Sequence, residues 1–448
     1  MSASTYLIRN AKIVNEGVVF EGDILIENEF IKEISEKISV KTSDVIIIDA
    51  EGSYVIPGAI DDQVHFREPG LTHKGTIETE SKAAVAGGIT SFIEQPNTVP
   101  NAVTQELLED KYQIAAKTSY ANYSFMMGGT NDNLEEILKT NPRNVAGLKL
   151  FLGSSTGDML VDDQQILKDI FLSTDLIIVV HSEDEQIINE NLKKYRTKYN
   201  SNIPFDCHSK IRSAEACLKS TKKIIKLAKE TNARLHVFHL STKAESLLFQ
   251  NDIPLKEKKI TSEVCVHHLW FSDKDYQEKQ SYIKWNPAIK TDNDREGLWD
   301  SLLEDRIDVI ATDHAPHTLE EKSKPYLDCP SGGPLVQHAL VSMIQHHLNN
   351  KISLEKIVTK MCHNPAILFQ IKKRGYIRKG YYADLVLIDM NKSWTVNKEN
   401  ILYKCNWSPF EGLQFDSQVT HTIVNGKLVY ENGLINSTLS GKKLTFNR

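Results

Sequence analysis

The run Leu176-Ile177-Ile178-Val179-Val180-His181 is an apolar stretch of strand length that ends in a histidine. Similar apolar runs recur through the middle of the chain and end near His65, Asn97, Gly128, Lys149, His181, His239, His267 and Asp313. Stretches with helical spacing lie between them, at residues 79–87, 105–117, 163–171, 214–229 and 295–303. Strands that alternate with helices in this way predict an α/β fold, a closed (β/α)8 TIM-like barrel.

The two ends of the chain have a different character. Short β segments separated by turn residues occupy residues 6–10, 17–20, 23–27 and 30–34, and similar segments occupy 383–389 and 422–430. Two all-β ends around an alternating middle predict one small β-sandwich built from both termini. We therefore expect a composite sandwich of residues 1–56 and 376–448, and a barrel of residues 57–375.

Composition excludes several classes of function. The 448 residues carry a formal net charge of -6, with both signs spread along the chain, so no basic stripe predicts nucleic-acid binding. No apolar run approaches the roughly 20 residues that span a bilayer, and the N-terminus lacks a secretory pattern. We expect a soluble, cytoplasmic protein. Its six scattered cysteines form no Cys-x-x-Cys pair and predict free thiols, so metal ligands would come from His, carboxylate or Lys.

Four of the strand-ending residues could bind a metal ion: His65, His181, His239 and Asp313. Any one of them alone would more often be a hydrogen-bonded core or rim residue. The carboxyl ends of barrel strands meet at one rim, however, so four such residues at equivalent points converge. Imidazole and carboxylate together suit zinc, with manganese or cobalt as substitutes. His236 should face away from His239 by strand alternation, and His267 and His268 read as structural.

Lys149 lies inside Gly147-Leu148-Lys149-Leu150-Phe151-Leu152, a strand that should be buried on both faces. An unpaired buried ammonium is costly, and burial lowers the pKa of its amine. A neutral amine could react with carbon dioxide to give a carbamate that bridges metals. An ion pair with a nearby carboxylate is the alternative, and the residues alone leave both open.

The first barrel strand leads into Asp61-Asp62-Gln63-Val64-His65-Phe66-Arg67-Glu68-Pro69-Gly70. This segment almost has the His-x-His pair that opens many binuclear metallohydrolase sites, but Gln63 stands where the first His would be.

Together these residues resemble the amidohydrolase superfamily, and within it the cyclic amidohydrolases: dihydroorotases, allantoinases and hydantoinases. In that family two strand-one histidines, a carboxylated Lys, two further histidines and an Asp hold two divalent metals. His65, Lys149, His181, His239 and Asp313 occupy five of those six places. The resemblance implies one or two zinc ions per chain and favours the carbamate on Lys149.

The flanking residues are similar to the dihydroorotase form of the family. In it the Arg of His65-Phe66-Arg67-Glu68-Pro69-Gly70 binds the substrate carboxylate, helped by the residues that correspond to Asn97 and His317. Asn286 and Gly333 lie in segments that resemble those contacting the substrate ring. A guanidinium fork matches the two oxygens of a carboxylate. The alternative for Arg67 is a salt bridge to Glu68 or to a loop carboxylate.

The resemblance implies a reaction, the reversible cyclisation of N-carbamoyl-L-aspartate to L-dihydroorotate in pyrimidine biosynthesis, by a metal-activated water with Asp313 as general base and acid. Two alternatives stay open. The chain could be another cyclic amidohydrolase (an allantoinase or hydantoinase), or a catalytically inactive dihydroorotase-like assembly subunit that supports a transcarbamoylase. We expect a homodimer.

Gln63 leaves three outcomes for the metal centre. The second metal could bind weakly, one metal could be held mainly by Lys149, His181 and His239, or the protein could be inactive. Because five of six ligands and the whole carboxylate-binding set are present, we favour an active enzyme with an altered metal centre. The loop at residues 318–330 is a candidate for closing over the substrate.

Overall fold

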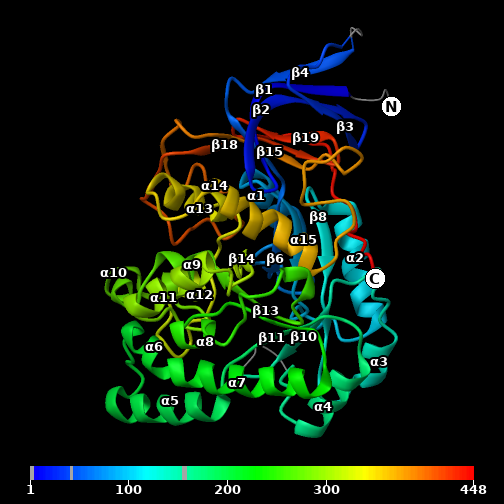
Figure 1. The fold of residues 1–448 in the computed structure, drawn as a ribbon. Helices are drawn as coiled ribbons and strands as arrows, with labels where there is room; N and C mark the ends of the chain where they lie inside the picture. The colour runs from blue at the N-terminus through cyan, green and yellow to red at the C-terminus, as the bar shows by residue number, and fades with distance from the viewer. Residues whose placement is uncertain (1–4, 41–43, 154–158) are drawn as a thin grey trace.

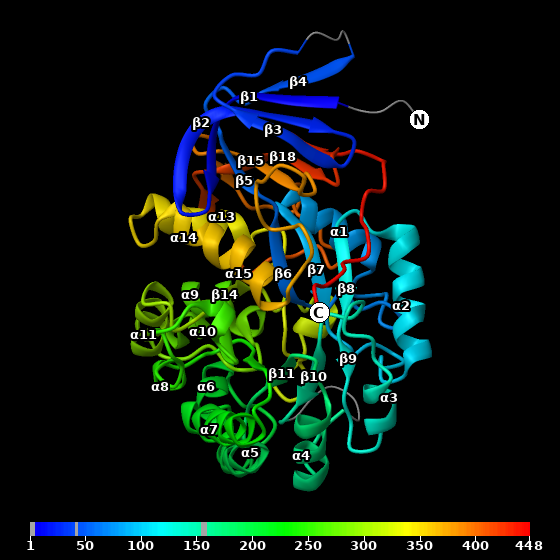
Figure 2. The same cartoon turned by 45° about the vertical axis from the view of Figure 1, so that its right-hand side comes forward.

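A computed structural model of the chain describes residues 5–40, 44–153 and 159–448. In both views a twisted sheet lies above a β/α barrel, and helices α4, α5 and α7 lie at the far side of the barrel from that sheet (Figures 1 and 2). The predicted fold class is confirmed. The strand ends that matter for function lie in the barrel.

The barrel strands follow one another around a closed circle. They are β6 (Ala59–Val64), β7 (Ile89–Glu94), β8 (Asn122–Phe125) continued by β9 (Met127–Gly128), β10 (Leu148–Phe151), β11 (Ile178–His181), β12 (Leu235–Val237), β13 (Ile260–Cys265) and β14 (Val309–Ala311). Each pairs in parallel with the next, and β8 and β9 link β7 to β10. The backbone N–H of His65 donates to the carbonyl oxygen of His314 at 2.7 Å, which closes the circle between β6 and the end of β14.

Helices fill the connections between the strands and extend beyond them. They are α1 (Ile77–Ala86), α2 (Gln105–Thr118), α3 (Leu134–Leu138), α4 (Gln164–Ser173), α5 (Glu185–Tyr199), α6 (His208–Ile211), α7 (Ala214–Thr231), α8 (Lys243–Ser246), α9 (Val266–Trp270), α10 (Tyr276–Lys279), α11 (Asp292–Leu303), α12 (Leu319–Lys322), α13 (Ala339–Leu348), α14 (Leu354–Val358) and α15 (Asn364–Leu368). Side-chain caps such as Thr104 and Ser213 accept hydrogen bonds from the first turns of α2 and α7. The five predicted helical stretches coincide with α1, α2, α4, α7 and α11.

Both termini build the second unit. Its sheet contains β1 (Thr5–Asn15), β2 (Val18–Glu27), β3 (Phe30–Ser35), β4 (Val45–Asp49), β5 (Tyr54–Pro57), β15 (Leu385–Asp389), β18 (Gln418–Val424), β19 (Lys427–Glu431) and β20 (Leu434–Ile435), while β16 (Trp394–Thr395) and β17 (Gln414–Phe415) pair separately. The antiparallel pair β5–β15 joins the N-terminal to the C-terminal strands. Ile8, Ile24, Leu385 and Ile423 form part of the buried core between them.

Two C-terminal segments leave this sheet and pack on the barrel. Leu444 and Phe446, near the end of the chain, are buried in a cluster with Ile60 and Ile93 of β6 and β7. Further upstream, the indole N–H of Trp407 donates to the carbonyl oxygen of His317 at 2.7 Å. The region after residue 376 therefore contributes to both units.

All six cysteines are buried and free, as predicted. Within residues 5–40, 44–153 and 159–448, none of the helices combines the length and apolar character that crossing a membrane requires.

Candidate active site

The side chains at the carboxyl ends of the barrel strands converge on one cavity of about 140 Å³. Its lining includes nine of the ten predicted site residues: His65, Arg67, Asn97, Lys149, His181, His239, Asn286, Asp313 and His317. Gly333, the tenth, lies behind the lining, where a Cβ atom would come within 2.6 Å of the Trp285 ring. Its neighbour Gly332 lines the cavity instead.

Three of these residues have left-handed backbone conformations. The φ angles are 74° at Arg67, 39° at His239 and 49° at Asp313. The strands β12 and β14 end before His239 and Asp313, so a tight turn rather than the pleat aims these side chains. Non-glycine residues at positive φ cost about 1–3 kcal/mol and cluster at functional sites.

His181 and His239 face each other across the cavity. Nδ1 of His181 lies 3.1 Å from Nε2 of His239. On its other side, Nε2 of His181 lies 2.9 Å from Oε2 of Glu183, so the ring proton belongs on Nε2 and a lone pair points at His239. Burial lowers the pKa of His181, and lowers that of His239 well below its ordinary value, so both rings are neutral.

A buried ion pair holds this arrangement in place. Arg212 donates from Nε to Oε2 of Glu183 at 2.9 Å. Burial alone would raise the pKa of the Glu183 carboxyl, but the charge of Arg212 and the hydrogen bond with His181 hold it below its ordinary value. Glu183 is therefore an anion that orients His181.

His65 and Asp313 form a second facing pair. Nδ1 of His65 lies 2.8 Å from Oδ1 of Asn97, so the ring donates its proton there. Nε2 then presents a lone pair to Oδ1 of Asp313, 3.2 Å away. Burial lowers the pKa of His65, which disfavours a second ring proton.

These pairs suit a divalent metal. In the second pair, Nε2 of His65 and the Asp313 carboxylate are both acceptors and repel unless a cation or proton lies between them. Ligands of a tetrahedral zinc with bonds of about 2.0–2.1 Å are about 3.3 Å apart. The observed separations of 3.1 Å and 3.2 Å fit that spacing. His65, His181, His239 and Asp313 can therefore hold metal.

Lys149 lies under this set, fully buried, with its Nζ 4.0 Å from the centre of the Phe238 ring. Burial lowers the pKa of Lys149 to about 7. A substantial share of the amine is thus neutral near neutral pH, the form that a carbamate requires.

On the opposite side the cavity is cationic. Nη2 of Arg67 lies 3.0 Å from Nε2 of His317, and Lys74 Nζ lies 3.1 Å from Nδ1 of the same ring. Burial lowers the pKa of Arg67 to about 10, which leaves the guanidinium charged at neutral pH. Burial and the charge of Arg67 lower the pKa of His317 well below its usual range. The positive charge here therefore belongs to Arg67 and Lys74. Because Lys74 is paired with the carboxylate of Glu321 at 3.0 Å, Arg67 is the cation available to a substrate.

Buried lysines fix the loop over this side. Lys322 donates to the carbonyl oxygens of Pro330 and Gly332 at 3.1 and 2.8 Å, and Lys284 donates to that of Tyr326 at 2.7 Å. In this structure the predicted closing loop at 318–330 is already tied to the barrel. Beside it, the buried Oδ1 of Asn286 has no hydrogen-bond donor among the described residues.

Three histidines differ from the sequence interpretation in their surroundings. His236 points into the barrel: it meets Glu263 of the adjacent strand β13, and Asp62 of β6, which lies across the barrel. The alternation of side chains along the strand does not extend to His239, because β12 ends at Val237. His267 and His268 lie in α9 rather than in a strand, and both are buried.

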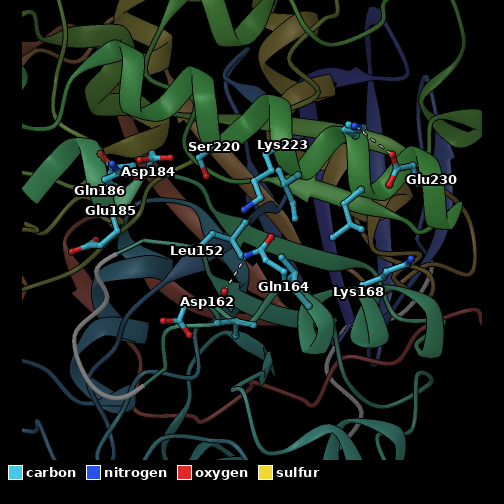
Figure 3. Close-up of a pocket in the computed structure, with 16 residues that line it drawn as sticks. Leu152, Asp162, Gln164, Lys168, Asp184, Glu185, Gln186, Ser220, Lys223 and Glu230 are labelled. Carbon is cyan, nitrogen blue, oxygen red and sulfur yellow. Dashed lines mark hydrogen bonds and ion pairs between the residues drawn. The ribbon is translucent and has the colours of Figure 1, made fainter.

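A second, larger cavity of about 360 Å³ lies outside the barrel rim (Figure 3). Gln164 and Lys168 of α4, Gln186 of α5, and Lys223 of α7 line it. Apart from Glu183, it contains none of the residues that orient the strand-end histidines, so the smaller cavity is the candidate active site.

Sequence reasoning missed several contributors to the site. Arg212, Lys74 and Lys322 come from distant loops and helices, and nothing in their local sequence distinguishes them from surface basic residues. Glu183 could have been predicted, because it follows the strand-ending His181 by two residues and so belongs to the rim of the barrel.

The fold and site define a barrel hydrolase with a divalent-metal centre at the carboxyl ends of its strands. Residues 54–429 match the family described as the Amidohydrolase family. The chain is 32% identical to a dihydroorotase of Staphylococcus epidermidis (95% of this chain, 99% of that one) and 33% identical to one of Carboxydothermus hydrogenoformans (95% and 98%). Its fold is similar to that of the L-hydantoinase (dihydropyrimidinase) of Arthrobacter aurescens, with a TM-score of 0.92 and 26% identity over 98% of this chain and 99% of that one.

The chain therefore belongs to the amidohydrolase family, and it is a metal-dependent cyclic amidohydrolase.

Proposed function

We propose that the protein is a dihydroorotase, which interconverts N-carbamoyl-L-aspartate and L-dihydroorotate. The observation that carries this proposal is the position of Arg67. Its guanidinium lies in the same small cavity as the candidate metal ligands and next to His317. The curated relatives named dihydroorotase support the same substrate.

A ring carboxylate explains why the cavity has a cationic side. L-Dihydroorotate is dihydrouracil with a carboxylate on the ring, and a buried guanidinium would be costly without an anion to pair with. Arg67 and His317 would grip the carboxylate, as the resemblance implies, with Asn97 beside them. Asn286, whose Oδ1 lacks a donor, would accept a ring N–H.

The metal would be zinc, one or two ions per chain, held by His65, Lys149 as its carbamate, His181, His239 and Asp313. When bound, such an ion acidifies water and polarises an amide carbonyl. Asp313 accepts the proton of the attacking water as general base and then donates it to the leaving ring nitrogen as general acid. Arg67 fixes the substrate by its carboxylate, which places the reacting carbonyl beside Asp313.

The alternative is another cyclic amidohydrolase, since the similar solved structures include hydantoinases. Dihydroorotate and dihydrouracil form a matched substrate pair that differs only in the carboxylate. We expect kcat/KM at least about 30-fold higher for dihydroorotate, because a charge-assisted pair contributes about 2–5 kcal/mol. Equal rates, or a preference for dihydrouracil, hydantoin or allantoin, would refute the proposal.

An inactive assembly subunit is the remaining alternative, and zinc-loaded protein with bicarbonate that binds dihydroorotate without turnover would favour it. The homodimer and the association with a transcarbamoylase stay predictions.

A further inference from the structure

Beneath the active-site cavity, three side chains meet in the barrel interior. Asp62 lies on β6, His236 on β12 and Glu263 on β13. Since β6 pairs with neither β12 nor β13, Asp62 can reach them only across the inside of the barrel. None of the three lines the active-site cavity, and each is 0% exposed.

The strand β6 sends two successive residues inward. Its pairing with β7 shifts register between Asp61 and Val64, which is the signature of a bulge. As a result Gln63 lines the cavity while Asp62 points to the cluster below it. Gln63 and Asp62 therefore lie at two different levels of the barrel interior.

His236 can direct a lone pair at the two carboxylates. Oγ1 of Thr261 lies 2.9 Å from Nδ1 of His236 and 3.2 Å from the carbonyl oxygen of Leu235. When the ring proton is on Nδ1, the hydroxyl accepts it and donates its own proton to Leu235, and Nε2 keeps a lone pair. This is the tautomer that a metal ligand requires.

The three acceptor atoms lie at the spacing of metal ligands. Nε2 of His236 is 3.2 Å from Oε2 of Glu263 and 3.5 Å from Oδ2 of Asp62. The expected distance between ligands of a tetrahedral zinc is about 3.3 Å. Moreover, neither carboxylate oxygen of Asp62 has a hydrogen-bond donor among the described residues, although both are buried.

Two buried carboxylates that face each other need a proton or a cation between them, and the ligand spacing together with the unpartnered oxygens of Asp62 favours a cation. From this we infer that Asp62, His236 and Glu263 bind a divalent transition-metal ion of the zinc type inside the barrel, separate from the rim site. Both oxygens of Asp62 can coordinate, which together with His236 and Glu263 supplies four ligand atoms. The remaining oxygen of Glu263, Oε1, accepts from the backbone N–H of His239 at 3.2 Å. The inner ion therefore supports the turn that aims a rim ligand.

The test is zinc content, which does not depend on any substrate. Wild-type protein and Asp62→Asn are loaded with zinc chloride and dialysed together, and zinc per chain is measured by mass spectrometry. We expect Asp62→Asn to hold one equivalent less than wild type. Glu245→Gln is the matched control: Glu245 is a buried glutamate bonded to Thr221 and Thr242, and its variant should keep the full content.

Diffraction keeps the inference testable if Asp62→Asn does not fold. An anomalous peak at the zinc edge between Asp62, His236 and Glu263 of the wild-type protein is the expected result. Equal zinc in wild type and Asp62→Asn, or a map with no peak at this position, would overturn the inference. Turnover of dihydroorotate is measured separately, so failure here is distinguishable from failure of the proposed function.

Discussion

Gln63 donates a hydrogen bond from its amide Nε2 to Oδ1 of Asp313, over 3.3 Å. The other end of the amide, Oε1, lies 3.6 Å from Sγ of Cys265, whose S–H is a donor to it. An amide that points its N–H at Asp313 offers no lone pair on that side. Gln63 thus holds the proposed general base in position, where a histidine would coordinate metal.

Replacing Gln63 separates these two roles. Gln63→Leu should retain zinc and lower kcat about tenfold, because a hydrogen bond to a charged group contributes roughly 1.5 kcal/mol. Gln63→His should bind zinc more tightly than wild type, since imidazole is the better ligand. Metal analysis after dialysis, together with steady-state kinetics, measures both. Loss of zinc from Gln63→Leu would show that Gln63 is itself a ligand.

Arg67 should control substrate affinity without affecting the metal. For Arg67→Ala we expect KM for dihydroorotate to rise about 100-fold, because a buried charged pair contributes about 2–5 kcal/mol. Rates with dihydrouracil and zinc content should stay unchanged. Arg67→Lys keeps the charge but lacks the planar guanidinium fork. Its KM for dihydroorotate should lie between those of the wild type and Arg67→Ala. A drop in zinc content in either variant would place Arg67 at the metal instead.

Glu183 should tune metal affinity through His181. Glu183→Gln weakens the acceptor 2.9 Å from Nε2 of His181, and such changes typically cost about 10–100-fold in metal affinity. Competition with a chelator gives the zinc dissociation constant. Glu80→Gln is the control, because Glu80 forms a similar buried contact of 2.9 Å with His314, which does not line the cavity. Equal affinity in both variants would contradict this role.

Lys322 should make stability depend on pH. Burial lowers its pKa to about 7 in the folded protein, whereas an exposed lysine has a pKa of about 10.4. Between those values the unfolded chain binds a proton that the folded protein does not, so the stability from this group rises with pH. From pH 7.5 to 9.5 it should add about 2–3 kcal/mol. Denaturant unfolding of wild type and Lys322→Met at both pH values measures the difference. An identical pH slope in both proteins would contradict the prediction.

Much of the barrel could be predicted because the sequence pattern that indicates it is local. Apolar runs of strand length alternate with amphipathic stretches, and the residue after each run reaches a shared rim whatever the details of packing. This reasoning places His65, Lys149, His181, His239 and Asp313 around one cavity, as the structure has them.

What could not be predicted depends on contacts between distant residues. Arg212 reaches Glu183 from another loop, and Trp407 reaches His317 from the C-terminal region. The positive φ of His239 interrupts the alternation that would have turned His236 outward. The bulge in β6, which the local sequence does not indicate, turns Asp62 into the barrel.

The hydrogen bond from Trp407 to the backbone of His317 ties the wall of the active site to a stretch of chain that follows the barrel by many residues. The catalytic half of the molecule is thus not a removable module. Removal of Trp407 and the chain that follows it would free the wall beside His317 and would also uncover Ile60 and Ile93 in the barrel core. Because Trp407 contacts the wall of the active site, the ribosome must synthesise most of the chain before the active site can form.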